Sequence, residues 1–190
     1  MSKKGLLLWT IFALHVLATG VHAANLTHFP ILINLSTDTD LSADARSDGF
    51  DILFTEDDGT TQLDHEIETY VSGTGALVAW VRIPSLSSTV DTQVYMYYGY
   101  ASSPNQQNAN GVWDANYEGV WHLNETVTDE QITAAAHNES TSNPNDGDQN
   151  GNDDIAGQIA KGQDFDGAND GITIADHQQS IRELARELGR

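Results

Sequence analysis

The chain lacks cysteine, and its 190 residues include only eight lysines and arginines against 28 aspartates and glutamates. Without disulfides, an exported domain must be held together by its hydrophobic core, or by its core and a metal ion. The scarcity of basic residues argues against nucleic acid as a partner, because such binding needs Lys and Arg to neutralise phosphates. It argues equally against anionic membrane surfaces. The acidic excess favours solubility, with divalent cation binding as the alternative.

Long apolar runs are missing after the N-terminus. Residues 3–4 are lysines, and residues 6–18 form an apolar stretch. Val21 and Ala23 place small side chains at positions −3 and −1 before a cut ahead of Ala24. The stretch is shorter than the ~20 residues that span a bilayer, and the arrangement is typical of a signal peptide. We therefore predict a signal peptide over residues 1–23 and a secreted, periplasmic or cell-surface protein. With all 28 acidic and six of the eight basic residues retained, the mature charge is −22.

Short β-prone segments fill the first half of the chain. Apolar and polar side chains alternate along most of them, which is the period of half-buried strands. Residues 76–84 are nearly all apolar, as in a central strand. Turns rich in Gly, Asp and Ser join the segments, so we predict an all-β fold, an antiparallel β-sandwich of jelly-roll-like type. The expected strands cover residues 27–35, 49–54, 60–71, 76–84 and 92–100.

The second half of the chain is less regular. Residues 101–111 are small, polar and rich in Asn and Gln, which is typical of a linker. Residues 127–154 contain few large apolar side chains, so we expect them to order only by wrapping another sheet or by binding an ion. Residues 155–176 recover weak β character, and residues 180–190 form a basic helical pattern.

Three stretches in order, DGFDILFTEDDGTTQLDHEIETY, ALVAWVRIPSL and TQVYMYYGY, resemble the bacterial domain of unknown function 2341. The shared features are an Asp-Ile-x-Phe-Thr strand, an acidic turn with Gly, Leu-x-x-Glu-Ile-Glu, Trp-Val-x-Ile-Pro and Tyr-x-Tyr-Tyr-Gly. The resemblance implies such a domain over about residues 45–118.

A second resemblance begins at GVWHLNE, residues 119–125, and continues through STSNPNDGDQNG and FDGANDGITI. These stretches resemble the opening of a laminin-G-like or concanavalin A-like lectin/glucanase domain, which normally continues for another hundred residues. The resemblance implies that Trp113 ends the last strand of the first domain and Trp121 starts the next. The expected domains are residues 24–118, an incomplete lectin-like β-sandwich over 119–176 and an atypical helical tail over 177–190, as in a truncated gene product.

A candidate calcium site lies in the DGDQNGND stretch, with Asp146, Asp148, Asn150 and Asp153 as ligands. Their spacing matches the first positions of a calcium loop. Position twelve would be Gly157 rather than a bidentate Glu, and no helices flank the stretch, so it is not an EF-hand. The alternatives are an oxygen cage on a sandwich loop and a disordered polar loop.

Aromatic side chains offer candidate ligand-binding residues. We select Tyr95, Tyr97, Tyr117 and Trp121 as rings that could stack on sugars, with core packing as the alternative. The alternation places Val94, Met96 and Tyr98 on one face of their strand, and it assigns Trp80 and Tyr98 to the core.

No catalytic residues are predicted. Asp64, Glu66 and Glu68 share one strand face, where a solvated surface is the simpler interpretation than the carboxylate pair of a glycosidase. Asp51 is expected to be structural. No Ser-His-Asp set appears, and His65 and His122 are expected to be buried core residues.

Together these features predict an exported, non-catalytic recognition module that binds a polysaccharide or another surface polymer, with calcium as the candidate ion. Three other interpretations stay open, one of which is a gene remnant without function. The chain could be an accessory fragment of a larger secreted glycan-active enzyme. Relatives implied by the resemblance also suggest a periplasmic domain of a proton channel that energises biopolymer transport.

Overall fold

The computed structural model describes residues 24–143 and 145–175. The chain forms two compact units, which we call unit 1 and unit 2, and the division falls between Val112 and Trp113. The boundary expected from the sequence, residue 118, lies a few positions further along the chain.

Both units are built from antiparallel strands, so the predicted all-β, sandwich-like fold is confirmed. The predicted signal peptide, residues 1–23, and the predicted helical tail, residues 177–190, lie outside the described residues. Within the described residues, no helix has both the length and the apolar character that crossing a membrane requires.

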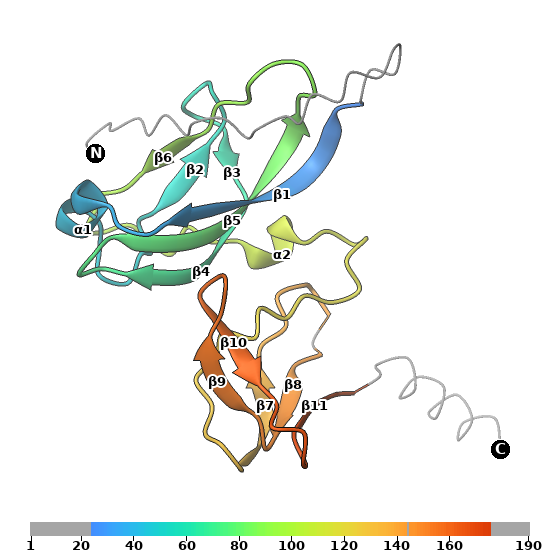
Figure 1. Cartoon of the computed structure of the whole chain (residues 1–190). Coiled ribbons are helices and arrows are strands. Elements are labelled where there is room, and N and C mark those ends of the chain that lie inside the picture. The colour runs from blue at the N-terminus through green and yellow to red at the C-terminus, as the bar shows by residue number, and fades with distance from the viewer. Residues whose placement is uncertain (1–23, 144, 176–190) are drawn as a thin grey trace. The chain divides into compact units, whose positions relative to one another are not determined.

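The first sheet of unit 1 has the strand order β1-β5-β4 (Figure 1). Its middle strand is the apolar segment that the sequence assigned to a central position. One face of this strand is buried and the other is partly exposed, so it is covered less completely than expected. The strands are β1 (Leu26–Leu35), β4 (His65–Val71) and β5 (Ala76–Leu86).

The second sheet of unit 1 has the order β3-β2-β6. Phe54 and Met96 are paired across it and are buried, whereas Tyr95 and Tyr97 alternate with Met96 and are half-buried. The strands are β2 (Leu53–Thr55), β3 (Gln62–Leu63) and β6 (Tyr95–Tyr97).

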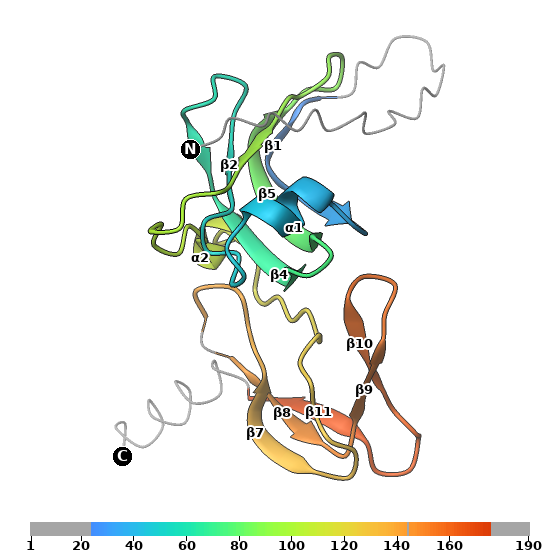
Figure 2. The ribbon, with the colours of Figure 1, turned by 90° about the vertical axis from the view of Figure 1, so that its left-hand side faces the viewer.

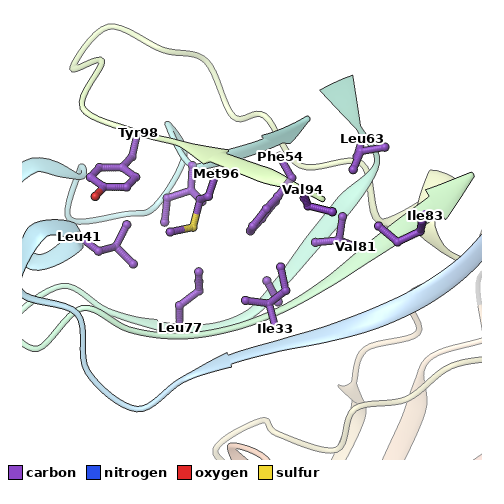
Figure 3. Packing of buried hydrophobic residues seen from close by; sticks show 12 residues of the cluster. Ile33, Leu41, Phe54, Leu63, Leu77, Val81, Ile83, Val94, Met96 and Tyr98 are labelled. Carbon is purple, nitrogen blue, oxygen red and sulfur yellow. The ribbon is translucent and has the colours of Figure 1, made fainter. Parts of the chain in front are cut away.

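A single apolar cluster fills the space between these two sheets (Figure 3). The buried alternation of Val94, Met96 and Tyr98 agrees with the sequence prediction. The members of the cluster are Ile33, Leu41, Ile52, Phe54, Leu63, Leu77, Ala79, Val81, Ile83, Val94, Met96 and Tyr98.

A short helix between β1 and β2 closes one end of this cluster. Helix α1 (Thr39–Asp44) starts after Asp38, whose carboxylate accepts a 2.8 Å hydrogen bond from the Leu41 N–H. This N-cap fixes Leu41, which is fully buried. Gly75 permits the close approach of the next turn, since a Cβ there would lie 1.9 Å from the Asp38 carbonyl oxygen.

Asp51 ties three segments of unit 1 together through a buried carboxylate. The side chain is 2% exposed. Its oxygens accept backbone hydrogen bonds from Arg46 at 3.0 Å, from Gly99 at 2.7 Å and from Tyr100 at 3.0 Å. A carboxylate with three N–H donors stabilises the ends of both β2 and β6. The structural role expected for Asp51 therefore has a geometric basis.

Residues 101–111 are not a free linker, because they cover the edge of β4. The Gln107 side chain accepts a 2.7 Å hydrogen bond from the Ile67 N–H, and the Asn108 N–H donates to the His65 carbonyl at 2.9 Å. Polar side chains can replace a neighbouring strand at an open edge. The chain then forms helix α2 (Ala109–Val112) and no strand at Trp113, so the strand expected there is wrong.

Unit 2 contains a three-stranded sheet of order β11-β8-β7 and a two-stranded ribbon of β9 and β10 (Figure 2). Trp121 forms an isolated bridge with Glu139 rather than starting a regular strand. The strands are β7 (Ile132–His137), β8 (Gly147–Asn150), β9 (Asp153–Ala156), β10 (Lys161–Asp164) and β11 (Gly171–Ile174).

A buried polar network orders unit 2. His137 is 0% exposed and lies 3.0 Å from a Glu125 carboxylate oxygen through Nδ1. The Asn152 amide nitrogen donates to His137 Nε2 at 3.2 Å and to Gln163 Oε1 at 2.7 Å. Gln149, also buried, donates to the Asn152 carbonyl at 2.7 Å. Because buried amides and imidazoles require partners, this satisfied network specifies the arrangement of these segments.

Residues 127–154 pair with strands outside this segment, β8 with β11 and β9 with β10, and the expectation that they order only by wrapping another sheet or by binding an ion stays a prediction. They contribute β7, β8 and part of β9, and side-chain hydrogen bonds link these strands. Several large apolar side chains of unit 2 are exposed, among them Ile132 at 80% and Ile155 at 51%.

The Asp51→Ala variant should lower the free energy of unfolding of unit 1 by about 3 kcal/mol, because buried N–H groups lose their acceptor. Hydrogen exchange of the β5 amides measures this change. Asp57→Ala, an exposed change in the neighbouring turn, should stay within ~0.5 kcal/mol. Equal protection in Asp51→Ala and the unmodified protein would contradict the role of this carboxylate.

His65 makes unit 1 sensitive to acid. Its ring is 0% exposed and packs edge-on against Phe54, with centroids 5.2 Å apart. Burial lowers the pKa of His65 below the usual 6.5, although nearby backbone carbonyls oppose the shift. The unfolded chain therefore takes up this proton first as the pH falls.

We predict that unit 1 loses stability as the pH falls from about 6.5 toward the lowered pKa of His65, by at most ~1.4 kcal/mol per pH unit. Exchange of the β5 amides at pH 7, 6 and 5 measures the slope. His65→Leu should reduce the slope of stability against pH by the contribution of one proton. An unchanged slope in that variant would refute the assignment to His65.

In unit 2, Asn152→Ala should raise the exchange rates of the β8 amides by an amount equivalent to about 2 kcal/mol, since His137 and Gln163 lose a buried donor. The exposed Asn150→Ala variant is the matched control. The β5 amides of unit 1 should not respond. Unchanged protection of β8 in Asn152→Ala would show that the network does not order this unit.

Candidate functional site

A cavity of about 250 Å³ opens in the surface of unit 1. Its floor consists of Leu63, Ile83 and Val94, which are at most 7% exposed and belong to the apolar cluster. Figure 3 shows these three side chains at one end of the cluster, away from Leu41 and Tyr98. The packed core therefore supplies the floor, so the cavity has a fixed apolar base.

The turn between β2 and β3 forms one wall and contributes Glu56 and Asp57. Asp58 holds this turn in shape. Its carboxylate accepts hydrogen bonds from the Thr60 N–H at 2.8 Å and the Thr61 N–H at 2.7 Å, and from the Thr61 hydroxyl. These donors, first of all the Thr61 hydroxyl, lower the pKa of Asp58 to about 2. The turn thus keeps its geometry throughout the physiological pH range.

The loop between β5 and β6 forms the opposite wall. Its own side chains fold it, because the Ser87 hydroxyl accepts from the Thr89 N–H at 3.2 Å and the Val90 N–H at 3.1 Å. Such Ser-centred turns replace the hydrogen bonds of regular structure. Together with the end of β5, the loop lines the cavity with Pro84, Ser85, Ser87, Val90, Asp91, Thr92 and Gln93.

Three carboxylates of this cavity have no protein partner among the described residues. The side chains of Glu56, Asp57 and Asp91 make no hydrogen bond or ion pair there. Other acidic side chains of unit 1 are occupied, as Asp51 and Asp58 are by three hydrogen bonds each. The cavity therefore combines an apolar floor with carboxylates that have no partner among the described residues.

The predicted residues Tyr95 and Tyr97 do not line this cavity. They lie on the outer face of β6, opposite Thr55 and Leu53 of β2, and are half-buried. The Tyr97 hydroxyl donates to the Gly59 carbonyl at 3.2 Å and so braces the β2–β3 turn.

The other two predicted rings, Tyr117 and Trp121, belong to unit 2. Tyr117 packs edge-on against Trp113, with centroids 5.2 Å apart. Trp121 donates from Nε1 to the Asn145 carbonyl at 2.9 Å, and its ring lies so close to Gly119 that a Cβ there would approach within 2.2 Å. Two of the four predicted rings therefore lie in unit 1 and the other two in unit 2.

The predicted calcium ligands lie along strands rather than around a loop. Asp146 directly precedes β8, and Asp148 and Asn150 project from the same exposed face of that strand, while Asp153 starts β9. Asp146 and Asp148 each accept a backbone hydrogen bond, at 2.9 and 2.8 Å. Over residues 24–143 and 145–175, no three His, Cys, Asp or Glu side chains come close enough to share a metal ion. Calcium binding stays a prediction.

The acidic face predicted on β4 is more constrained than a solvated surface. Glu68 accepts a 2.9 Å hydrogen bond from the indole of Trp80, and Asp64 accepts one of 2.8 Å from Asn108. Glu66 is half-buried opposite Trp80, which is itself half-buried rather than a core residue. His65 is buried as predicted, whereas His122 is only half-buried, 5.8 Å from the Trp113 ring.

The sequence analysis missed the acidic rim of the cavity and the buried His137. Glu56 and Asp57 follow β2, and Asp91 precedes β6. Because β2 and β6 are antiparallel neighbours, the last residue of β2 and the first residue of β6 lie at the same end of the sheet. Knowledge of which strands pair would have predicted that these residues are neighbours. The alternation of apolar and polar residues within one segment gives no information about strand pairing.

One segment of the chain matches a known protein family. Residues 48–131 match the model of a family described as Domain of unknown function (DUF2341). The match agrees with the resemblance expected over residues 45–118, and it extends past Trp121 to Gln131. Neither the curated proteins nor the solved structures contain a match to the chain. The segment from 48 to 131 is thus similar to the domain of unknown function 2341.

Proposed function

We propose that the chain is an exported, non-catalytic recognition module that binds a glycan or another surface polymer in the cavity of unit 1. The export proposal rests on the pattern of residues 1–23. The binding proposal rests on one observation, a cavity with an apolar floor and unoccupied oxygen acceptors.

The size of the cavity favours one sugar-sized group. Pockets that enclose drug-sized ligands have volumes of ~300–1000 Å³, and this cavity measures about 250 Å³. Leu63, Ile83 and Val94 offer contact to the apolar face of a sugar ring. The surrounding carboxylates, the Ser85 hydroxyl and the Gln93 amide can bond to its hydroxyl groups.

Recognition fits this cavity better than hydrolysis. The general acid of a glycosidase is normally buried in apolar surroundings, which keep it protonated. Asp57 and Asp91 are exposed, and Glu56 is only half-buried. The lining contains no His, Lys or Arg that could replace such an acid.

Filling the cavity should abolish binding. We predict that the protein is retarded in native gels that contain a recognised polysaccharide, and that Ser85→Trp and Gln93→Trp each remove at least 90% of the retardation. Both positions are exposed and line the cavity, so a larger side chain blocks it without entering the core. No reducing sugar should be released, with or without Glu66→Gln.

Tyr95→Ala serves as the matched control, because this ring lies on the outer face of β6. Loss of retardation in Tyr95→Ala, with Ser85→Trp unaffected, would move the site to that face and contradict the cavity. Absence of retardation in neutral, acidic and amino polysaccharide gels alike would contradict the recognition function.

A further inference from the structure

We infer that the cavity of unit 1 selects glycans that carry a protonated amino group over neutral and acidic ones. The inference rests on the proposed function and adds the ligand class. Three observations carry it: the charge of the rim, the unoccupied state of its carboxylates, and the arrangement of those carboxylates around an apolar floor.

The rim has one sign of charge. Glu56, Asp57 and Asp91 line the cavity, and among the residues that the structure describes no Lys, Arg or His does. The whole chain adds to this field with a formal charge of −20. Three like charges around a partly apolar concavity attract a cation and repel uronates and sulfated sugars.

The three carboxylates are available for a ligand. None of them is neutralised by a hydrogen bond or ion pair within the described residues. Elsewhere in the chain, acidic side chains near a basic group pair with it, as Asp154 does with Lys161 at 2.7 Å. At the cavity, no basic group of the described residues lies beside the carboxylates, so a cationic ligand would meet no competing partner there.

An ammonium group on a sugar fits better than a metal ion. No three acidic or histidine side chains of the described residues converge closely enough to share one ion. Glu56 and Asp57 come from the β2–β3 turn, whereas Asp91 comes from the β5–β6 loop. Carboxylates spread over two walls suit an ammonium group together with several hydroxyl donors. The apolar floor suits the carbon face of the ring.

The two walls are rigid before the ligand arrives. Asp58 holds the turn beside Glu56 and Asp57, and Ser87 organises the loop before Asp91. Preorganised acceptors lose little conformational entropy on binding. The backbone that carries the three carboxylates is therefore shaped by hydrogen bonds before a ligand binds.

The inference is tested by calorimetric titration of the full-length protein with three oligosaccharides of equal length, built from glucosamine, N-acetylglucosamine and galacturonate. We expect the glucosamine oligomer to bind at least tenfold more tightly than the acetylated one, and the galacturonate oligomer not to bind. Affinity for the glucosamine oligomer should fall as salt rises, because exposed charges are screened.

Neutralising the rim should reduce this preference. Glu56→Gln, Asp57→Asn and Asp91→Asn should each weaken glucosamine binding about threefold, as expected for exposed ion pairs, and the triple variant more than tenfold. Glu118→Gln and Asp164→Asn make the same chemical changes at exposed positions in unit 2 and should have no effect.

The outcomes separate the two proposals. Equal affinity for the free and the acetylated amine, unaffected by the rim variants, would overturn the amine selectivity while the recognition function stands. Preferential binding of galacturonate would also overturn it. Binding of a lysine peptide with no saccharide binding would overturn the sugar as the carrier of the amine. Absence of all binding would contradict both proposals.

Discussion

Burial of one apolar cluster between two three-stranded sheets is the constraint on which unit 1 depends. The cluster determines which face of β2, β5 and β6 points inward. Three of its members, Leu63, Ile83 and Val94, form the floor of the cavity. The site is thus the uncovered end of the core. Asp51 adds a polar clamp at the turns that the sheets leave open, because its buried carboxylate satisfies three backbone N–H groups.

Alternation in the sequence was sufficient for the strands of unit 1 and for their inner faces. Val94, Met96 and Tyr98 were predicted to share a face and are all buried. The outer faces were predicted less well. Trp80 was assigned to the core, yet it lies on the outer face of β5 and donates to Glu68. Cross-strand neighbours decide such contacts, and a single segment does not contain them.

Polar composition did not predict the ordered structure of two segments, for the same reason. Residues 101–111 resemble a linker, and the segment around His137 resembles a disordered loop, because Asn and Gln are frequent in both. In the structure, these side chains replace missing strands or missing apolar contacts with hydrogen bonds, as Gln107 does at β4 and Asn152 does around His137. Such partners are distant in sequence, so composition alone cannot distinguish an ordered polar network from a solvated loop. The acidic rim was not predicted for a similar reason, since Glu56 and Asp91 come to the same end of the sheet only through the pairing of β2 with β6.

The central claim is that the open end of the unit 1 core binds a ligand. Chemical-shift mapping of the isotope-labelled protein during titration with glucosamine and neutral oligosaccharides tests it most directly. The account predicts saturable shifts at the floor and rim, in particular at Leu63, Ile83, Asp91 and Val94, with unit 2 unaffected. Shifts confined to the outer face of β6 or to unit 2, or none with any saccharide, would contradict it.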